Sequence, residues 1–308
     1  MKPLLSLTLG LALWSAVGAS SPPQGDDHPI LSVRTDLVTL PVTVVDRQGA
    51  LVAALRREHF TVYDNGERQT IQFFTNEDLP ATIGLVIDSS GSMRSHREEV
   101  TAAAAAFAAI SHPLGEFFTV NFNEAVWLGL PPALPFTEDT GQLHAAVSAA
   151  PARGMTALYD AVDRALDHLQ HGSRDRKALI VVSDGGDNAS SRTLEAVVEL
   201  ARRTNAVIYS VTVFDPDNRD ARPQVLKTLA RETGGRAFTL RGGEGVTGSF
   251  AQIAREIRSG YTIGFVPADT SGDGFRPLRV VADAGDDRQL IVRTRAGYYA
   301  GPSRGPIR

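Results

Sequence analysis

Runs of apolar residues divide the chain into a β-rich start, an alternating centre and a β-rich end. Between residues 30 and 74 the apolar positions lie in Thr- and Val-rich runs, and the tripeptide DNG at 64–66 separates Thr61–Tyr63 from Gln69–Phe74. Asn-Gly accepts the positive φ angles of a tight turn. This stretch therefore predicts a hairpin within a small antiparallel β module.

At Ala81 the spacing of apolar residues along the chain changes. Ile83–Ile87 and Ala178–Val182 are continuous apolar runs, which are typical of strands buried on both faces. Helical and strand patterns alternate around them. Helices are expected over 94–110, 140–149, 157–170, 194–203, 224–232 and 250–258, and further strands over 117–122, 125–130, 206–214 and 237–240. The alternation predicts an α/β domain with a doubly wound, mostly parallel sheet of the Rossmann type.

Strand patterns return after Gly260, over 261–266, 278–282 and 290–295. Because the ends of a chain often lie close together, we expect these strands to join the N-terminal β module. The predicted organisation is a signal peptide (1–19), a linker (20–29), an N-terminal β module (30–78), an α/β domain (79–260), a C-terminal β segment (261–299) and a flexible tail (300–308).

The first residues have the features of an export signal. Lys2 precedes an apolar stretch from Leu4 to Val17, and the small residues up to Ala19 form a cleavage pattern. An uncleaved anchor is the alternative, but the stretch is shorter than the roughly 20 residues that span a bilayer. We expect an exported protein that is periplasmic, on the cell surface or secreted, with no stable membrane insertion after cleavage.

Composition narrows the chemistry that the chain can carry. Its 31 Lys and Arg against 35 Asp and Glu give a net charge of -4, which does not favour a nucleic-acid partner. It contains no cysteine, so thiolate metal sites, iron–sulfur clusters and cysteine nucleophiles are excluded. A bound metal would be held by oxygen or imidazole ligands.

The most informative string reads DSSGS and follows the first buried strand. Its Asp88, Ser90 and Ser92 are spaced so that one carboxylate and two hydroxyls can converge at the carboxyl end of a strand, where open α/β sheets bind ligands. Thr156, ahead of a predicted helix, and Asp184, behind the second buried strand, are expected at the same edge. This oxygen set suits Mg²⁺, with Mn²⁺ or Ca²⁺ as alternatives.

With these five residues in this order, the chain resembles von Willebrand factor A (VWFA) domains and their metal-ion-dependent adhesion site. The strings TALYD from Thr156 and SDG from Ser183 add to the resemblance. The flanking segments, LPVTVVDRQG from Leu40 and YTIGFVP from Tyr261, resemble a narrower group, the VWFA-related domain family described from acidobacteria. Together the resemblance covers about residues 33–299.

The resemblance implies a role for each of the five residues. Ser90 and Ser92 would bind the metal directly, Thr156 directly or through water, and Asp88 and Asp184 through bridging waters. It also implies a non-enzymatic module that binds a protein ligand, whose Asp or Glu carboxylate fills an open position on the metal.

Other interpretations stay open. A hydrolase using the same metal would need a general base, for which Asp187 is the candidate, and a structural envelope scaffold would carry an idle site. Thr156 could cap the following helix, and Asn123 could lie at the rim. His168 and His171 are interpreted as surface residues, and the GEGVTG string at 243–248 as a flexible loop despite its match to GxGxxG. The oligomeric state has no signal in the sequence.

Overall fold

The structure is a computed structural model that describes residues 37–149, 152–213, 221–240, 245–268, 274–286 and 288–300. The predicted signal peptide, the predicted linker and residues 301–308 of the predicted tail lie outside these ranges. Within them, no helix has the length and apolar character needed to cross a membrane.

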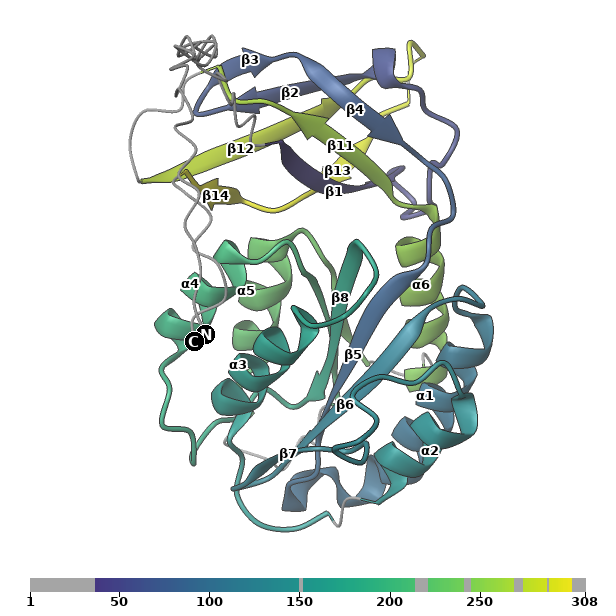
Figure 1. The fold of residues 1–308 in the computed structure, drawn as a ribbon, viewed down its shortest axis with the longest axis vertical. Coiled ribbons are helices and arrows are strands. Elements are labelled where there is room, and N and C mark those ends of the chain that lie inside the picture. The colour runs from purple at the N-terminus through teal and green to yellow at the C-terminus, as the bar shows by residue number, and fades with distance from the viewer. Residues whose placement is uncertain are drawn as a thin grey trace, which may run out of the picture. The chain divides into compact units, whose positions relative to one another are not determined.

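Six strands form the central sheet. They are β5 (Ala81–Asp88), β6 (Glu116–Phe122), β7 (Val126–Leu128), β8 (Arg176–Ser183), β9 (Val207–Thr212) and β10 (Ala237–Thr239). Their order is β10-β9-β8-β5-β6-β7, and every neighbouring pair is parallel except β6 with β7. This confirms the predicted doubly wound, mostly parallel sheet (Figure 1).

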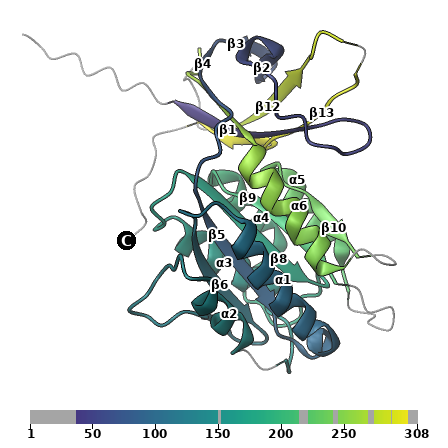
Figure 2. The same cartoon turned by 90° about the vertical axis from the view of Figure 1, so that its right-hand side faces the viewer.

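Helices cover both faces of this sheet. One face carries α1 (Arg97–Ile110), α2 (Thr140–Ser148) and α6 (Val246–Ser259), and the other carries α3 (Leu158–Leu169), α4 (Leu194–Arg203) and α5 (Pro223–Thr233). Figure 2 shows the first group from its own side. Along β5, Ile83 and Leu85 belong to the core under α1 and α6, whereas Val86 belongs to the core under α3. Alternate residues thus meet different helices, which explains why the whole strand is apolar.

Two helix starts differ from the prediction. The helix expected from residue 94 opens with a 3₁₀ turn, η2 (Gly91–His96), before α1 begins. Helix α6 begins at Val246, so residues 246–248, predicted as loop, are helical. The carboxylate of Glu99 on α1 accepts a hydrogen bond of 2.9 Å from Val246 N, and this contact with a distant helix fixes the start of α6.

The remaining strands form two antiparallel sheets. Their members are β1 (Val38–Val45), β2 (Phe60–Asp64), β3 (Glu67–Gln69), β4 (Ile71–Thr75), β11 (Tyr261–Phe265), β12 (Phe275–Ala282), β13 (Ile291–Arg293) and β14 (Gly297–Tyr299), with a 3₁₀ turn η1 (Arg57–His59) before β2. The sheets have the orders β13-β1-β11-β4 and β14-β12-β2-β3. Both combine N- and C-terminal strands around one apolar core. The predicted joining of the two chain ends is confirmed.

The predicted hairpin turn is also confirmed, and the strand predicted after it is divided in two. Asp64 pairs with Glu67, and the two residues between them, Asn65 and Gly66, have φ angles of 50° and 86°. The stretch predicted as one strand over 69–74 belongs to two strands, because strand pairing is interrupted at Thr70. It leaves one sheet with β3 and enters the other with β4.

Candidate metal site

The candidate site lies where the sheet changes its winding direction. The neighbouring strands β5 and β8 lead to α1 and α4, which cover opposite faces. The two connections therefore diverge and leave a crevice at the carboxyl ends of the strands. Asp88 is the last residue of β5, and Ser183 is the last residue of β8.

Asp88 is held at this edge by two donors. Its Oδ1 accepts from Ser90 N at 2.8 Å, and its Oδ2 accepts from the Ser183 hydroxyl at 2.7 Å. The side chain is almost fully buried, with 3% of Asp88 exposed. Both bonds orient the carboxylate before any ligand arrives.

The second candidate carboxylate, that of Asp184, contacts Ser92 directly and is linked through Ser92 to Ser90. Ser90 Oγ lies 3.2 Å from Ser92 Oγ, and the Ser92 hydroxyl donates to Asp184 Oδ2 at 2.9 Å. Gly186 N donates to Asp184 Oδ1 at 2.8 Å. The structure thus joins four of the five predicted residues, Asp88, Ser90, Ser92 and Asp184, in one network.

The segment that contains Thr156 is joined to the DSSGS loop by a backbone hydrogen bond. Gly91 N donates to Gly154 O at 3.2 Å, two residues before Thr156. Thr156 itself is buried, and its N–H donates to Asn188 Oδ1 at 2.8 Å. It is not the helix cap, because the capping residue of α3 is Ala157.

The electrostatics of the site favour a cation. Burial raises the pKa of the Asp88 carboxyl to about 6, and the charge of Asp184 adds to the rise, while hydrogen bonds from Ser90 and Ser183 oppose it. Two buried carboxylates this close together are costly without positive charge between or beside them. A divalent cation bound by the surrounding oxygens would remove that cost.

The donor set fits a hard cation such as Mg²⁺. It consists of carboxylate and hydroxyl oxygens, the ligands that Mg²⁺ accepts, and Mg²⁺ characteristically keeps bound waters. Across the described ranges, no group of three or more His, Cys, Asp or Glu side chains could hold a metal. The candidate site is compatible with this absence, because only two of its five residues, Asp88 and Asp184, are of these four types.

Asp187 contributes to the fold beside the site. Its Oδ1 accepts from Tyr159 N at 3.2 Å and from the Ser190 hydroxyl at 2.6 Å. It therefore holds the first turn of α3. The hydrogen bonds of this oxygen give Asp187 a structural role.

Two further candidates are placed differently from their predictions. Asn123 is buried, and its backbone carbonyl oxygen accepts from Ala157 N at 2.7 Å, so it supports the Thr156 segment. His168, interpreted from the sequence as a surface residue, is only 8% exposed, with ring centroids 4.6 Å and 4.8 Å from those of Phe118 and Phe136.

Three residues that shape the site were not identified as doing so from the sequence. Ser183 holds Asp88, Asn188 holds Thr156, and Glu124 Oε2 accepts from Met155 N at 3.1 Å. Ser183 sits in the SDG string, so its place at a strand end is a usable signal. Asn188 and Glu124 make contacts that no local pattern indicates.

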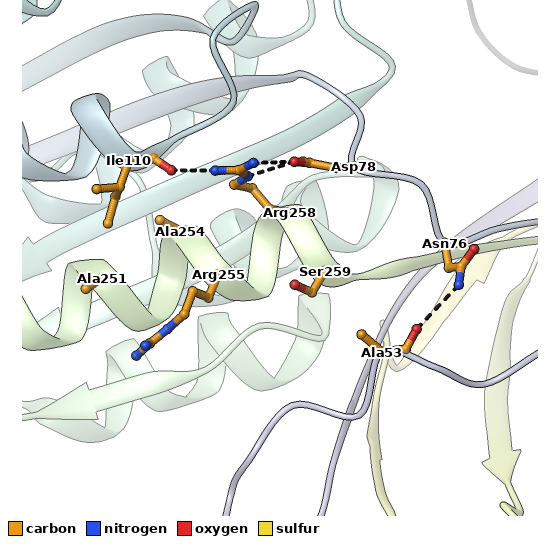
Figure 3. A pocket seen from close by; sticks show the side chains of 9 residues that line it. All are labelled: Ala53, Asn76, Asp78, Ile110, Ala251, Ala254, Arg255, Arg258 and Ser259. Atoms are coloured by element: carbon orange, nitrogen blue, oxygen red, sulfur yellow. Dashed lines mark hydrogen bonds and ion pairs between the residues drawn. The ribbon is translucent and has the colours of Figure 1, made fainter.

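Of the five predicted ligands, Asp88 lines one of two cavities found among the described residues. A cavity of about 530 Å³ lies beside the C-terminal half of α6 and includes none of the five residues. Figure 3 shows Arg258 reaching from α6 to Asp78 and to the Ile110 carbonyl, while Arg255 points away from this cluster. Next to Asp88 the cavity measures only about 10 Å³. Neither of these cavities is lined by Ser90, Ser92, Thr156 or Asp184.

A doubly wound sheet with a cluster of Asp and Ser at its switch point defines an α/β ligand-binding domain. Within that class, the chain belongs to the von Willebrand factor type A domain family. The family model matches residues 82–252, more than half of the chain, and this range contains all five candidate ligands.

Several solved structures share the fold. A von Willebrand factor type A protein from Catenulispora acidiphila is 12% identical, covering 87% of this chain and 74% of that one, with a TM-score of 0.52. The vWF domain of the type V pili tip protein Mfa5 from Porphyromonas gingivalis is 14% identical, covering 58% and 95%, with a TM-score of 0.49. The PilB minor pilin from Streptococcus sanguinis is 14% identical, covering 60% and 63%, with a TM-score of 0.47. These likenesses concern the fold alone. No curated protein matches the sequence.

Proposed function

We propose that the protein is an exported, non-enzymatic binding module that uses Mg²⁺ at this site to recognise an acidic residue on a protein partner. The observation that carries the proposal is the network joining Asp88, Ser90, Ser92 and Asp184. These residues come from two strand ends far apart in the sequence. Their shared chemistry is that of a hard-cation site.

Each residue has a defined part in the proposed site. The hydroxyls of Ser90 and Ser92 and that of Thr156 would face the metal as neutral ligands. Asp88 and Asp184 would supply two negative charges to balance the dication. A bound Mg²⁺ would offer an electrophilic position that a carboxylate oxygen of the partner can occupy.

Binding is favoured over catalysis by the contacts of the one candidate base. Asp187, the candidate base of the hydrolase alternative, has one carboxylate oxygen engaged in holding α3.

Mg²⁺ titration by calorimetry tests the metal site. The wild type should bind Mg²⁺, and the double variant Ser90→Ala/Asp184→Ala should not. Ser173→Ala/Asp286→Ala is a matched control that removes one serine and one aspartate elsewhere on the chain and should bind like the wild type. Equal heats from the wild type and the Ser90→Ala/Asp184→Ala variant would overturn the proposal.

Export is tested separately. The sequence predicts cleavage after Ala19, so the protein isolated from the cell envelope or medium should begin at Ser20. Intact-mass measurement gives the answer directly. A retained residue 1–19 segment in the isolated protein would contradict cleavage without bearing on the metal site.

A further inference from the structure

One wall of the candidate site is formed by the segment that leads into Thr156. Arg153 N donates to Ser89 O at 2.9 Å, and Gly91 N donates to Gly154 O at 3.2 Å. Ser89 and Gly91 alternate along the chain with the two candidate serine ligands. Arg153 is therefore fixed directly beside the loop that carries those ligands.

A second arginine belongs to the ligand loop itself. Arg94 lies in η2, two residues after Ser92, and both Arg94 and Arg153 are exposed. Within the residues that the structure describes, neither side chain forms a hydrogen bond or an ion pair. Arg97, by contrast, donates to the carbonyl oxygen of Ser148. Two exposed arginines that form no ion pair among the described residues thus lie in the segments that border the site, where Glu124 also places a carboxylate, at Met155 N.

The two arginines carry charge of the opposite sign to the net charge of the chain. The protein as a whole has a net charge of -4, so its overall field would repel an acidic segment. Any preference for such a segment must arise from positive groups close to the contact. A single partner carboxylate would be used at the metal and would leave both arginines without an ion pair.

We propose that Arg94 and Arg153 select a partner segment in which the metal-binding acidic residue is flanked by further acidic residues. This inference rests on the proposed function and specifies the partner's chemistry. Exposed pairs of this kind are weak, so each arginine should improve affinity by about 1.5- to 5-fold. Together they would distinguish an acidic cluster from an isolated Asp.

Two blocked synthetic pentapeptides, Gly-Gly-Asp-Gly-Gly and Glu-Gly-Asp-Gly-Glu, test the proposal by NMR titration at saturating Mg²⁺ and low salt. The wild type should bind the acid-flanked peptide roughly 3- to 10-fold more tightly. The advantage should shrink in Arg94→Gln and in Arg153→Gln, and should disappear in the double variant. It should also fall as salt is raised, because exposed charges are screened.

Controls separate the two proposals. Arg68→Gln, which removes an exposed charge from β3, should retain the full advantage, and Mg²⁺ affinity should be the same in all of these variants. Equal binding of both peptides in the presence of Mg²⁺, or an advantage that survives in the double variant, would overturn the role of the arginines and leave the proposed function intact. Binding that is absent, or unchanged by Mg²⁺ removal and by Ser90→Ala, would overturn both.

Discussion

The hydroxyl of Ser92 lies 2.9 Å from Asp184 Oδ2, although 92 positions separate the two residues in the sequence. This contact links the loop after β5 to the loop after β8, across the point where the sheet changes its winding direction. It forms because two parallel neighbouring strands end at the same edge. The fold therefore assembles the site from segments that have no local reason to meet.

Ser183 should control metal affinity without being a ligand. Its hydroxyl donates to Asp88 Oδ2 at 2.7 Å, so Ser183→Ala leaves the carboxylate less firmly oriented. Loss of such a supporting bond typically lowers metal affinity about 10- to 100-fold. Calorimetric Mg²⁺ titration measures the effect. Ser173→Ala is the control, because Ser173 also donates to a carboxylate, that of Glu116; an equal loss in both variants would contradict the assignment.

Mg²⁺ affinity should fall in acid because Asp88 must lose its proton. Its pKa is about 6, compared with an ordinary value of 3.8. Below about pH 6 the proton competes with the metal, so affinity should fall by roughly tenfold per pH unit. Titrations at pH 7.5, 6 and 5 at constant ionic strength test this, and a flat profile would contradict it.

In the metal-free protein, the raised pKa of Asp88 increases the free energy of unfolding at acidic pH, whereas Mg²⁺ affinity decreases there. Between 3.8 and about 6 the folded carboxyl of Asp88 holds a proton that the unfolded one has lost. The contribution of Asp88 therefore stabilises the fold at acidic pH and is lost as pH rises through about 6. Denaturant unfolding of the wild type against Asp88→Asn isolates this contribution, since the variant has no titrating group there.

The sequence predicted the central sheet well because its signals are local. Ile83–Ile87 and Ala178–Val182 are apolar throughout, because helices cover both faces of these strands. An uninterrupted apolar run can be recognised without knowing which helices cover it. The DSSGS string carried three candidate ligands for the same reason. Their spacing on one loop is visible without knowledge of any distant contact.

Features set by distant contacts were not predictable. Strand pairing is interrupted at Thr70 because β3 and β4 belong to different sheets. That division depends on the C-terminal strands that pair with β2 and β4. The start of α6 depends on Glu99, 147 positions away, and glycine-rich sequence there argued against a helix. Asn188 supports Thr156 only because two loops meet.

His168 should make the protein less stable in mild acid. Burial lowers its pKa below the ordinary 6.5, and the charges of Arg164 and His171 add to this, against opposing effects of Pro135 and Asp167. The unfolded chain therefore takes up a proton near pH 6.5 that the folded chain does not, so stability is lost as pH falls through that value.

Unfolding free energies between pH 8 and 5.5 measure this effect. In His168→Gln the pH slope should become shallower, whatever its absolute stability, because the titrating ring is gone. His144→Gln is the control, since His144 is exposed on α2 and is not among the groups that shift the pKa of His168, and its slope should stay close to that of the wild type. An unchanged slope in His168→Gln would contradict the prediction.

Gly154 should be required for the shape of the site. It has a φ of 82°, which costs a residue with a Cβ about 1–2 kcal/mol, and an added Cβ would clash with the carboxylate of Glu124. Gly154→Ala should therefore destabilise the protein by at least this amount. It should also weaken Mg²⁺ binding, because Gly154 O accepts from Gly91 N and Thr156 follows two residues later.

Two further variants separate the causes of the Gly154→Ala effect. Adding Glu124→Ala removes the clash but not the backbone strain, so it should restore only part of the stability. Gly248→Ala is the matched control, since a Cβ there meets nothing within 4 Å and the residue is helical; it should be neutral or stabilise the protein by up to about 1 kcal/mol. Chemical denaturation and Mg²⁺ titration of all three variants test this account. Gly154→Ala protein with wild-type stability and affinity would show that the loop tolerates another backbone conformation and does not position Thr156.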